Sequence, residues 1–548
     1  MQVEDKTEWP ITAHPFFKTA VLAGTILLPV AVNQVYPGEV FHHSKYLFIL
    51  ASFLAFLLAM LYLDQQGMRG ISSSSITISL LMPLCLLPSW FGSINKARSQ
   101  DVLWLFLAYL LLLLSVSWLE FDFKQIEGAV AVVCLIATIV GFIALYQYLF
   151  GLEELRKRFQ DSLSLEPLFK SRVLERIQSR RVLANYPLPN TLSGFLATVL
   201  PLQLYYAITH SPSSEGNLML GATWKNDIVT ALLMCCCLLS IIGLVLTQSF
   251  GGWVAGLASV SLAGILLTIS RKLRLRWVAA SFVLLFVLLV VWMVWVTHER
   301  GFALGNLKAP TNPIVLRWNN YKTAWHIFED FPWTGVGLGN YGTINPHYQG
   351  SPLTVTQYAH NTPLQLLSEL GVMAFFLAAG LLILSFKTLK LLLAKVRGDL
   401  ENPKNGNPSP EYGHPLMGQL QVEGRAQRGH ISPRCQRLHR AQPSRNPCVT
   451  DPLRHSKFEA GNRMALSIAL ASSLAAWGVH NLIDINLYFP SVGSLGVLIL
   501  GLLLSLLGSE TIETERAVLS GWPAKTVWII ALLVCIGSSF LVGRQYLV

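Results

Sequence analysis

Long uninterrupted runs of apolar residues recur along most of the chain. Each run is about 20 residues long, the length of helix that crosses roughly 30 Å of hydrocarbon. Backbone polar groups in lipid must be satisfied within a helix or a closed barrel, and no run alternates as a barrel strand would, so we expect helices. The predicted spans are 17–35, 45–63, 74–92, 100–119, 128–150, 190–208, 226–248, 252–270, 276–296, 367–392, 463–483, 489–508 and 525–544.

These runs predict an all-α polytopic membrane protein with about 12–13 transmembrane helices. The count depends on the short gap at 249–252, which is either a tight turn between two spans or a break in one long segment. Composition agrees, because 53% of the residues are hydrophobic and only 13% are charged. The first apolar run lacks a small-residue cleavage site, and its flank mixes acidic and basic residues, so we expect a retained span rather than a signal peptide.

The distribution of Lys and Arg among the loops predicts the orientation. Four basic residues crowd positions 271–276, and 395–463 is a long basic stretch. Cytoplasmic loops hold an excess of such residues, so both loops are expected inside. The segment 297–366 between them then forms one large non-cytoplasmic loop. Counting back along the spans puts the N-terminus in the cytoplasm, as expected for a multi-pass protein of the inner membrane.

This topology divides the chain into five parts: N-terminal transmembrane helices (1–150), a basic loop (151–187), a central core (188–392), a basic cytoplasmic loop (393–462) and C-terminal transmembrane helices (463–548). The apolar residues of 151–187 recur at roughly helical spacing, which predicts either an amphipathic helix on anionic lipid head groups or a solvated helical hairpin. The loop 393–462 is rich in Pro, Gly, Asn, Arg and Gln, which is typical of a disordered linker.

Charge and cysteine content exclude several functions. The net charge of +11 collects in the cytoplasmic loops and in 151–187, where topology and lipid contact account for it, so we expect membrane lipids rather than nucleic acid as partners. Cys235, Cys236 and Cys237 are consecutive in a predicted span, so they point in three directions about 100° apart. We therefore expect no metal site there, and the chain shows no pattern for a cofactor.

The richest polar segment outside the membrane is 314–371. Its motif pieces are Arg317, Trp325, the run 330–340 (DFPWTGVGLGN), the tripeptide 359–361 (AHN) and the pentapeptide 367–371 (LSELG). In this order and spacing they resemble the signature region of the O-antigen ligase and polymerase superfamily.

Three further pieces agree with this resemblance, which extends over roughly 128–508. The run 188–196 is similar to the family's Asn-Pro-Asn start of a span, and 246–253 to its Thr-x-Ser-Arg-Gly-x-Trp turn. His480 and Asp484 match a His-to-Asp pair that the family often carries. The stretch 151–155 also resembles a cyanobacterial branch, some of whose members were named for inorganic-carbon accumulation.

The resemblance implies a glycosyltransferase of the O-antigen ligase type. Its donor would be a glycan on a polyprenyl-diphosphate lipid carrier, and its acceptor would be lipid A core or another glycan on the non-cytoplasmic face. One alternative is a glycan-chain polymerase of the same superfamily, which differs in acceptor rather than in donor chemistry. Another is a divergent protein related to solute or inorganic-carbon transport, although the spans up to Val296 carry little of the mid-membrane charge typical of transporters.

Two residues of 314–371 are the candidate catalytic groups. A departing diphosphate needs a cation, and Arg317 offers two parallel hydrogen bonds to phosphate oxygens. An attacking hydroxyl needs a proton acceptor that titrates near neutral pH, and His360 is such a group. The simpler interpretations are an interfacial anchor beside Trp318 and an inert loop histidine.

The family's turn has an Arg, thought to bind the diphosphate, where this chain has Phe250. Another Arg outside the membrane, Arg180 or Arg181, is then expected to supply the charge; otherwise the donor differs or transfer is lost. The remaining candidate substrate-binding residues are Asn190, Asn361, Glu369, His480 and Asp484.

Spacing adds two expectations about this outer face. His480 and Asp484 share a helix face, where they form either a structural ion pair or part of the site. The three glycines at 335, 337 and 339 follow no predicted strand, so we interpret them as a tight turn rather than a dinucleotide site.

Overall fold

The computed structural model describes residues 40–65, 73–119, 121–161, 180–184, 186–209, 224–270, 274–299, 312–349, 354–401 and 452–508. Most of these residues are helical and none of them lies in a strand, which confirms the all-α polytopic fold. Within this part, nine helices are long and apolar enough to cross a membrane, and two further helices contain the shorter apolar stretches Phe48–Ala59 and Leu81–Phe91. The predicted spans 17–35 and 525–544 lie outside the described residues, as does most of the loop 393–462.

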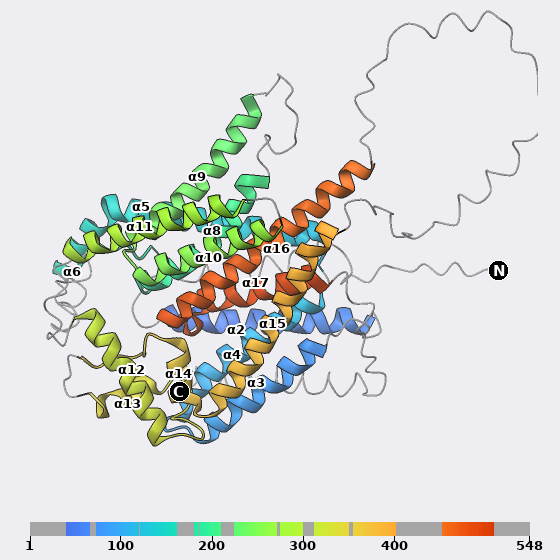
Figure 1. Ribbon diagram of the computed structural model, residues 1–548. Helices are drawn as coiled ribbons and strands as arrows, with labels where there is room; N and C mark the ends of the chain where they lie inside the picture. The colour runs from blue at the N-terminus through green and yellow to red at the C-terminus, as the bar shows by residue number, and fades with distance from the viewer. Residues whose placement is uncertain are drawn as a thin grey trace, which may run out of the picture.

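The helices lie side by side as a bundle, with a cap of short helices at one end (Figure 1). Their bounds are α2 Val40–Gln65, α3 Ser73–Phe91, α4 Lys96–Trp118, α5 Phe123–Tyr146, α6 Leu152–Asp161, α8 Pro189–Thr209, α9 Trp224–Leu246, α10 Phe250–Ile269, α11 Leu275–Glu299, α12 Pro313–Asp330, α13 Tyr341–Ile344, α14 Thr362–Leu370, α15 Met373–Glu401, α16 Pro452–Ile483 and α17 Pro490–Gly508. We call the segment 312–372, which carries α12 to α14, the cap.

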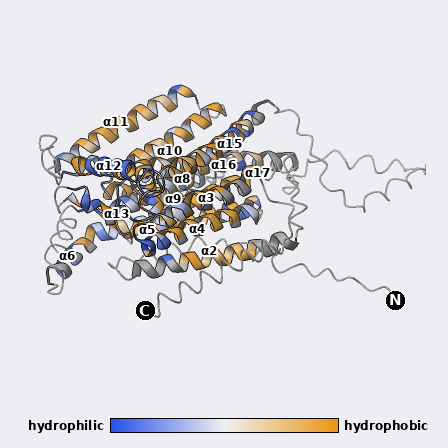
Figure 2. Cartoon of the chain, turned by 90° about the horizontal axis from the view of Figure 1, so that it is seen from below, coloured by the Kyte–Doolittle hydropathy of each residue, from blue (hydrophilic) through white to orange (hydrophobic). Residues whose placement is uncertain are grey.

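The centre and the edge of the bundle differ in burial although both are apolar. In α8 and in α17, 78% of the most apolar 18-residue stretch is buried. α16 packs against α8, α10 and α17. In α11 no residue of that stretch is buried, and Figure 2 shows this helix at the edge with hydrophobic residues along its length. α11 contacts α10 on one side, and the rest of its apolar surface is not covered by the described residues, as expected for a helix that faces lipid.

The structure changes one predicted span and decides one boundary that the sequence left open. The span predicted at 367–392 is split, because α14 ends at Leu370 and α15 begins at Met373. Gly371 between them has a φ of 61°, and a Cβ on it would lie 2.5 Å from the Pro332 carbonyl oxygen. The close approach of the 331–333 backbone therefore ends the helix, and only glycine tolerates it. The gap at 249–252 is a tight turn, since Ser249 caps a separate α10.

The basic loop predicted to begin at 151 starts as a continuation of α5. A π-helical turn over Gln147–Gly151 leads directly into α6, so the helix runs on to Asp161. A π turn shifts the hydrogen bonding by one residue without ending the helix, and for this reason the domain boundary at 150 is not a helix end. The helical spacing predicted for this loop is present through Asp161, and 162–179 lies outside the described residues.

Contacts between loops agree with the predicted alternation of spans. Asn340 Nδ2 in the cap donates to Ser93 Oγ between α3 and α4 at 2.9 Å. Arg181, before α8, donates to the Thr247 carbonyl oxygen between α9 and α10. The ends of α15 and α16 that flank the loop 402–451 lie at the opposite end of the bundle from the cap (Figure 1). The cap and the two helix ends that flank the basic loop thus lie at opposite ends of the bundle, and the side of the membrane on which each lies stays a prediction.

Candidate functional site

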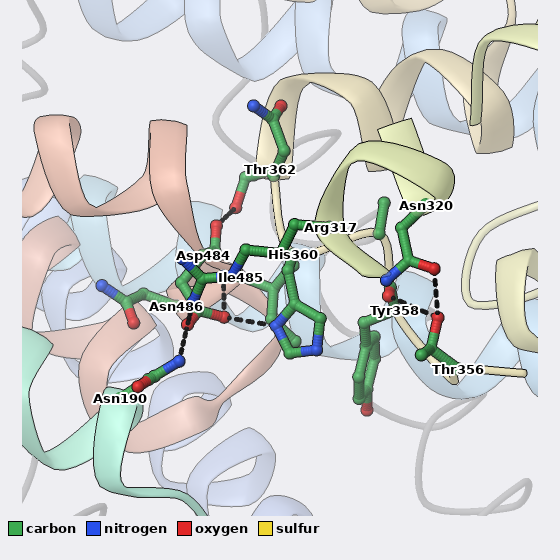
Figure 3. Close-up of polar contacts among 12 residues, drawn as sticks. Asn190, Arg317, Asn320, Thr356, Tyr358, His360, Thr362, Asp484, Ile485 and Asn486 are labelled. Atoms are coloured by element: carbon green, nitrogen blue, oxygen red, sulfur yellow. Dashed lines mark hydrogen bonds and ion pairs between the residues drawn. The ribbon is translucent and has the colours of Figure 1, made fainter. Parts of the chain in front are cut away.

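A buried carboxylate directly after α16 is the centre of the candidate site. Asp484 Oδ1 lies 3.0 Å from His360 Nδ1, and Asp484 Oδ2 lies 2.6 Å from Asn190 Nδ2. Arg317 Nη2 lies 3.9 Å from the same Oδ2 atom, as an ion pair. Figure 3 shows these side chains converging on Asp484 from the cap and from α8. Residues far apart in the sequence thus form one polar cluster, which we call the Asp484 cluster.

Capping residues in the cap set the positions of Arg317 and His360. Asn312 accepts a hydrogen bond from the Ile314 N–H and is followed by proline, which starts α12 and puts Arg317 on its second turn. Asn361 accepts from the Leu364 N–H and starts α14 in the same way. His360 therefore occupies the last position before a capped helix.

The backbone of His360 is held in a conformation that non-glycine residues rarely adopt. Its φ is 56°, in the left-handed region, which costs about 1–3 kcal/mol unless the surroundings fix it. The fixing contacts lie on both sides. The Ala359 N–H donates to Gln365 Oε1 at 2.7 Å, and the Thr362 N–H donates to the Asp484 carbonyl oxygen at 3.2 Å. The strain is therefore maintained by the contact between the cap and α16.

The contact with Asp484 determines which imidazole nitrogen of His360 is available. A carboxylate accepts hydrogen bonds, so Nδ1 carries the proton that points to Asp484 Oδ1. The lone pair is then on Nε2, on the other side of the ring, and one quarter of the side chain is exposed. His360 is thus oriented as a proton acceptor.

The charge of Asp484 follows from its neighbours. Burial alone would raise the pKa of its carboxyl group, but His360, His480 and Arg317 hold that pKa below its usual value. The carboxylate is ionised at neutral pH, and it stabilises a positive charge on the neighbouring imidazole.

The two arginines before α8 differ in position. Arg181 Nε donates to the Thr247 carbonyl oxygen at 2.9 Å, and Arg181 Nη2 donates to Asn190 Oδ1 at 2.7 Å. Arg180 is exposed, and no hydrogen bond joins its side chain to the described part of the Asp484 cluster. The structure therefore brings only Arg181 to the cluster. The turn it contacts is the one that carries Phe250, whose ring packs edge-on against Trp253.

Glu369 forms a second buried centre rather than part of the Asp484 cluster. Its carboxylate accepts from the Gly339 N–H at 2.7 Å, the Tyr341 N–H at 3.1 Å, Gln365 Nε2 at 2.7 Å and the Tyr488 hydroxyl at 2.5 Å. Burial raises the pKa of this carboxyl group, and the four hydrogen bonds oppose the rise. Because both carboxylate oxygens accept hydrogen bonds from the protein, Glu369 stabilises the structure of the cap rather than offering an acceptor to a ligand.

The three glycines predicted as a tight turn lie against this second centre. Gly335, Gly337 and Gly339 all have positive φ values, and a Cβ on Gly335 would lie 2.2 Å from the Glu369 carbonyl carbon. The turn packs closely on the end of α14. This close approach leaves no room for a Cβ and therefore requires glycine.

His480 does not pair with Asp484 through its side chain. His480 Nε2 lies 3.2 Å from Ser193 Oγ, and Nδ1 lies 2.7 Å from Asn486 Nδ2. All three side chains are buried, and a Cβ on Gly194 would lie 3.0 Å from Nδ1. The ion pairs of Asp484 in the described part of the chain are with His360 and Arg317 instead. His480 therefore supports the cluster from inside the bundle.

Several residues at the site escaped the sequence analysis. Thr362 Oγ1 donates to the Asp484 carbonyl oxygen at 2.9 Å, and the Tyr321 hydroxyl donates to the His360 carbonyl oxygen at 3.3 Å. Gln147 Oε1 accepts from the Leu183 and Ala184 N–H groups beside Arg181. Thr362 directly follows the AHN tripeptide, and this place in the sequence was a usable signal. Gln147 lies in an apolar span and offered none.

Asn361 also contributes to the joint between the cap and the bundle. Besides capping α14, its Nδ2 donates to the Leu482 carbonyl oxygen at 2.7 Å. The side chain is used by the protein at both ends. Within the described residues, no three His, Cys, Asp or Glu side chains gather as a metal site would require.

Comparison with known proteins finds a family match for the central part of the chain. Residues 235–379 match the family described as O-antigen ligase, a segment that runs from α9 into α15 and includes Arg317 and His360. A comparison with curated proteins finds no match. The family match supports glycan transfer or glycan polymerisation at the membrane, with lipid-linked glycan substrates. The multi-pass helical fold agrees with this match, so the chain is similar to the O-antigen ligase family over residues 235–379.

Proposed function

We propose that the chain transfers a glycan from a polyprenyl-diphosphate carrier to a hydroxyl group of an acceptor on the non-cytoplasmic face of the inner membrane. The acceptor is lipid A core or another glycan. The observation that carries this proposal is the Asp484 cluster, in which one carboxylate holds an oriented histidine and an ion-paired arginine at one end of the bundle.

His360 is the general base in this proposal. Its Nε2 takes the proton of the acceptor hydroxyl while the hydroxyl oxygen forms a bond to the anomeric carbon of the donor sugar. The bond from that carbon to the diphosphate oxygen breaks in the same step, and its electron pair leaves with the polyprenyl diphosphate. Asp484 stabilises the imidazolium that forms and keeps the ring in the required tautomer, since it accepts from Nδ1 at 3.0 Å.

Arg317 stabilises the leaving diphosphate. Its guanidinium has one ion pair, with Asp484 at 3.9 Å, and no hydrogen bond to another described residue. Three tenths of the side chain are exposed, so N–H donors are available for phosphate oxygens. One such preorganised donor contributes about 3–4 kcal/mol to transition-state stabilisation, roughly a hundred- to thousandfold in rate.

Arg181 is the second cation in this proposal and replaces the arginine that the family has at position 250. Its contact with the Thr247 carbonyl oxygen holds the guanidinium beside the turn that carries Phe250. A diphosphate carries more charge than one arginine neutralises, and two guanidinium groups on one leaving group explain why the cluster draws cations from both the cap and the segment before α8.

Reconstitution tests this function directly. The purified chain is placed in liposomes with a lipid-linked oligosaccharide donor and either lipid A core or a free glycan acceptor, and the products are identified by mass. We expect glycan transfer by the wild type and loss of transfer in His360→Ala and Arg317→Ala. His326→Ala and Lys322→Ala, which change exposed residues on α12, the helix that carries Arg317, are the matched controls and should retain transfer.

The length of the product separates ligation from polymerisation. A single addition to lipid A core identifies a ligase, whereas a ladder of lengths on a lipid-linked acceptor identifies a polymerase. Normal transfer in His360→Ala would remove that residue from the mechanism. No transfer by folded wild-type protein with any acceptor would overturn the proposal.

A further inference from the structure

Asn190 lies between the two charged halves of the site. It is the second residue of α8, and its amide Nδ2 donates to Asp484 Oδ2 at 2.6 Å. Its amide Oδ1 accepts from Arg181 Nη2 at 2.7 Å. One side chain thus connects the carboxylate that holds His360 to the guanidinium at the turn before α10.

These two partners fix the direction of the amide. In the reverse orientation Oδ1 would face the Asp484 carboxylate and Nδ2 would face the Arg181 guanidinium, so both contacts would be repulsive. Asn190 therefore donates to the anion and accepts from the cation. Aspartate at this position would lack the donor, and leucine would lack both the donor and the acceptor.

The backbone around the bridge is held on every side. Ser193 Oγ donates to the Asn190 carbonyl oxygen at 2.7 Å, and Ser193 itself contacts the buried His480. On the other side, the π turn after α5 supplies Gln147, whose Oε1 accepts from the N–H groups of Leu183 and Ala184 at 2.7 and 2.8 Å. The side chain of Asn190 is thus part of a rigid frame, which is what orientation of a reacting group requires.

We propose that Asn190 is a positioning residue that orients the Asp484 carboxylate toward His360 and the Arg181 guanidinium toward the leaving group, without itself contacting the substrate. This inference rests on the proposed function for its catalytic meaning. The sequence predicts Asn190 as a substrate-binding residue. Both polar ends of its amide are occupied by protein, which points to the connecting role instead.

The bridge makes a measurable prediction about His360. The charged and titratable groups that face it are Asp484 and His480 from the end of α16, Arg317 and Tyr321 from α12, and Arg181 through Asn190. Asn190→Asp replaces the donor to Asp484 with a second carboxylate. A negative charge on a side chain that contacts the same carboxylate as His360 favours the imidazolium form. The titration midpoint of His360 should therefore rise by about one pH unit.

The experiment measures that midpoint by NMR of histidine labelled with ¹³C in the imidazole ring, using the full-length chain in lipid nanodiscs. The spectrum of His360→Gln identifies the His360 signal. Asn319→Asp, which adds the same charge on α12 without a hydrogen bond to the described Asp484 cluster, is the matched control and should shift the midpoint much less. A midpoint in Asn190→Asp equal to that of the wild type would overturn the inference.

A neutral variant keeps the test valid if Asn190→Asp does not fold. Asn190→Leu preserves the size of the side chain but removes both hydrogen bonds. We expect it to raise KM for the donor, because Arg181 loses its orientation, and to lower kcat, because Asp484 loses a donor. A kcat and KM like those of the wild type would contradict the positioning role.

The NMR titration does not require glycan transfer, so the two proposals fail separately. If the wild type transfers no glycan but Asn190→Asp shifts the His360 midpoint, the connection between Asn190, Asp484 and His360 stands and the transferase proposal is overturned. Transfer by the wild type with an unshifted midpoint in Asn190→Asp would remove only the connection.

Discussion

Two buried carboxylates at the same end of the bundle have opposite surroundings. Glu369 accepts four hydrogen bonds, all from neutral donors, and holds the glycine turn of the cap against α14. Asp484 accepts from an imidazole and an amide and pairs with a guanidinium. The first centre is closed, whereas the histidine and arginine of the second are partly exposed.

In the proposed function, the carboxylate has a structural role at Glu369 and a chemical role at Asp484. Burial raises the pKa of the Glu369 carboxyl group, because neutral donors only partly replace water. The cationic and titratable neighbours of Asp484 outweigh burial and lower its pKa. A carboxylate that stays charged beside an oriented histidine can stabilise a transient positive charge, and a saturated carboxylate cannot.

The largest expected effect comes from removing the charge of the second centre. Asp484→Asn should lower the rate of glycan transfer by about a thousandfold or more, because an amide neither stabilises the imidazolium nor selects the tautomer with Nδ1 protonated. The liposome transfer assay measures the rate, and binding of the donor to the purified variant serves as the control. A loss below tenfold would contradict the catalytic role of the Asp484 cluster.

The next largest effect tests the second cation. Arg181→Ala should lower transfer by about a hundredfold, and Arg180→Ala, the matched control, should change it little. Phe250→Arg alone should add little, since Arg181 already serves the diphosphate. In the Arg181→Ala background Phe250→Arg should restore part of the activity, because two cations serving one group are coupled rather than additive. Additive effects would show that Arg181 and position 250 act on different groups.

A smaller effect is expected at the first centre, on stability rather than on transfer. Glu369→Gln places an amide N–H₂ among buried donors, so one backbone N–H of Gly339 or Tyr341 loses its acceptor. The free energy of unfolding should fall by about 1–3 kcal/mol. Thermal unfolding in nanodiscs measures this, and the folded fraction should keep a His360 titration like that of the wild type. A shifted His360 titration would show that the two centres are not separate.

The smallest effect is the pH dependence of stability. The folded-state pKa of Glu369 is raised, so its contribution to stability is fully present below the unfolded-state pKa and is lost as pH rises through the folded-state pKa. Asp484 has a lowered pKa, so its contribution is lost only as pH falls below the usual carboxyl range. From neutral pH toward the usual carboxyl range, the wild type should therefore become slightly more stable relative to Glu369→Gln. Parallel unfolding curves for the two proteins over this range would contradict the assignment.

The amino-acid sequence alone was sufficient for most of the described membrane helices and for part of the candidate site. A lipid environment demands helices of known length, so apolar runs identified spans such as 190–208 and 276–296 to within a few residues of α8 and α11. Motif pieces around Arg317 and His360 indicated a resemblance to the O-antigen ligase family, and the match over 235–379 supports it.

The packing of helices determined the rest. Asp484 is the centre of the site because α16 ends beside α8 and the cap, and no local pattern encodes a hydrogen bond between positions 190 and 484. The choice between Arg180 and Arg181 depended on where the α9–α10 turn presents its carbonyl oxygen. Apolar periodicity is a property of one segment and can be recognised in it. A polar cluster consists of distances between segments, and those exist only once the helices have packed against each other.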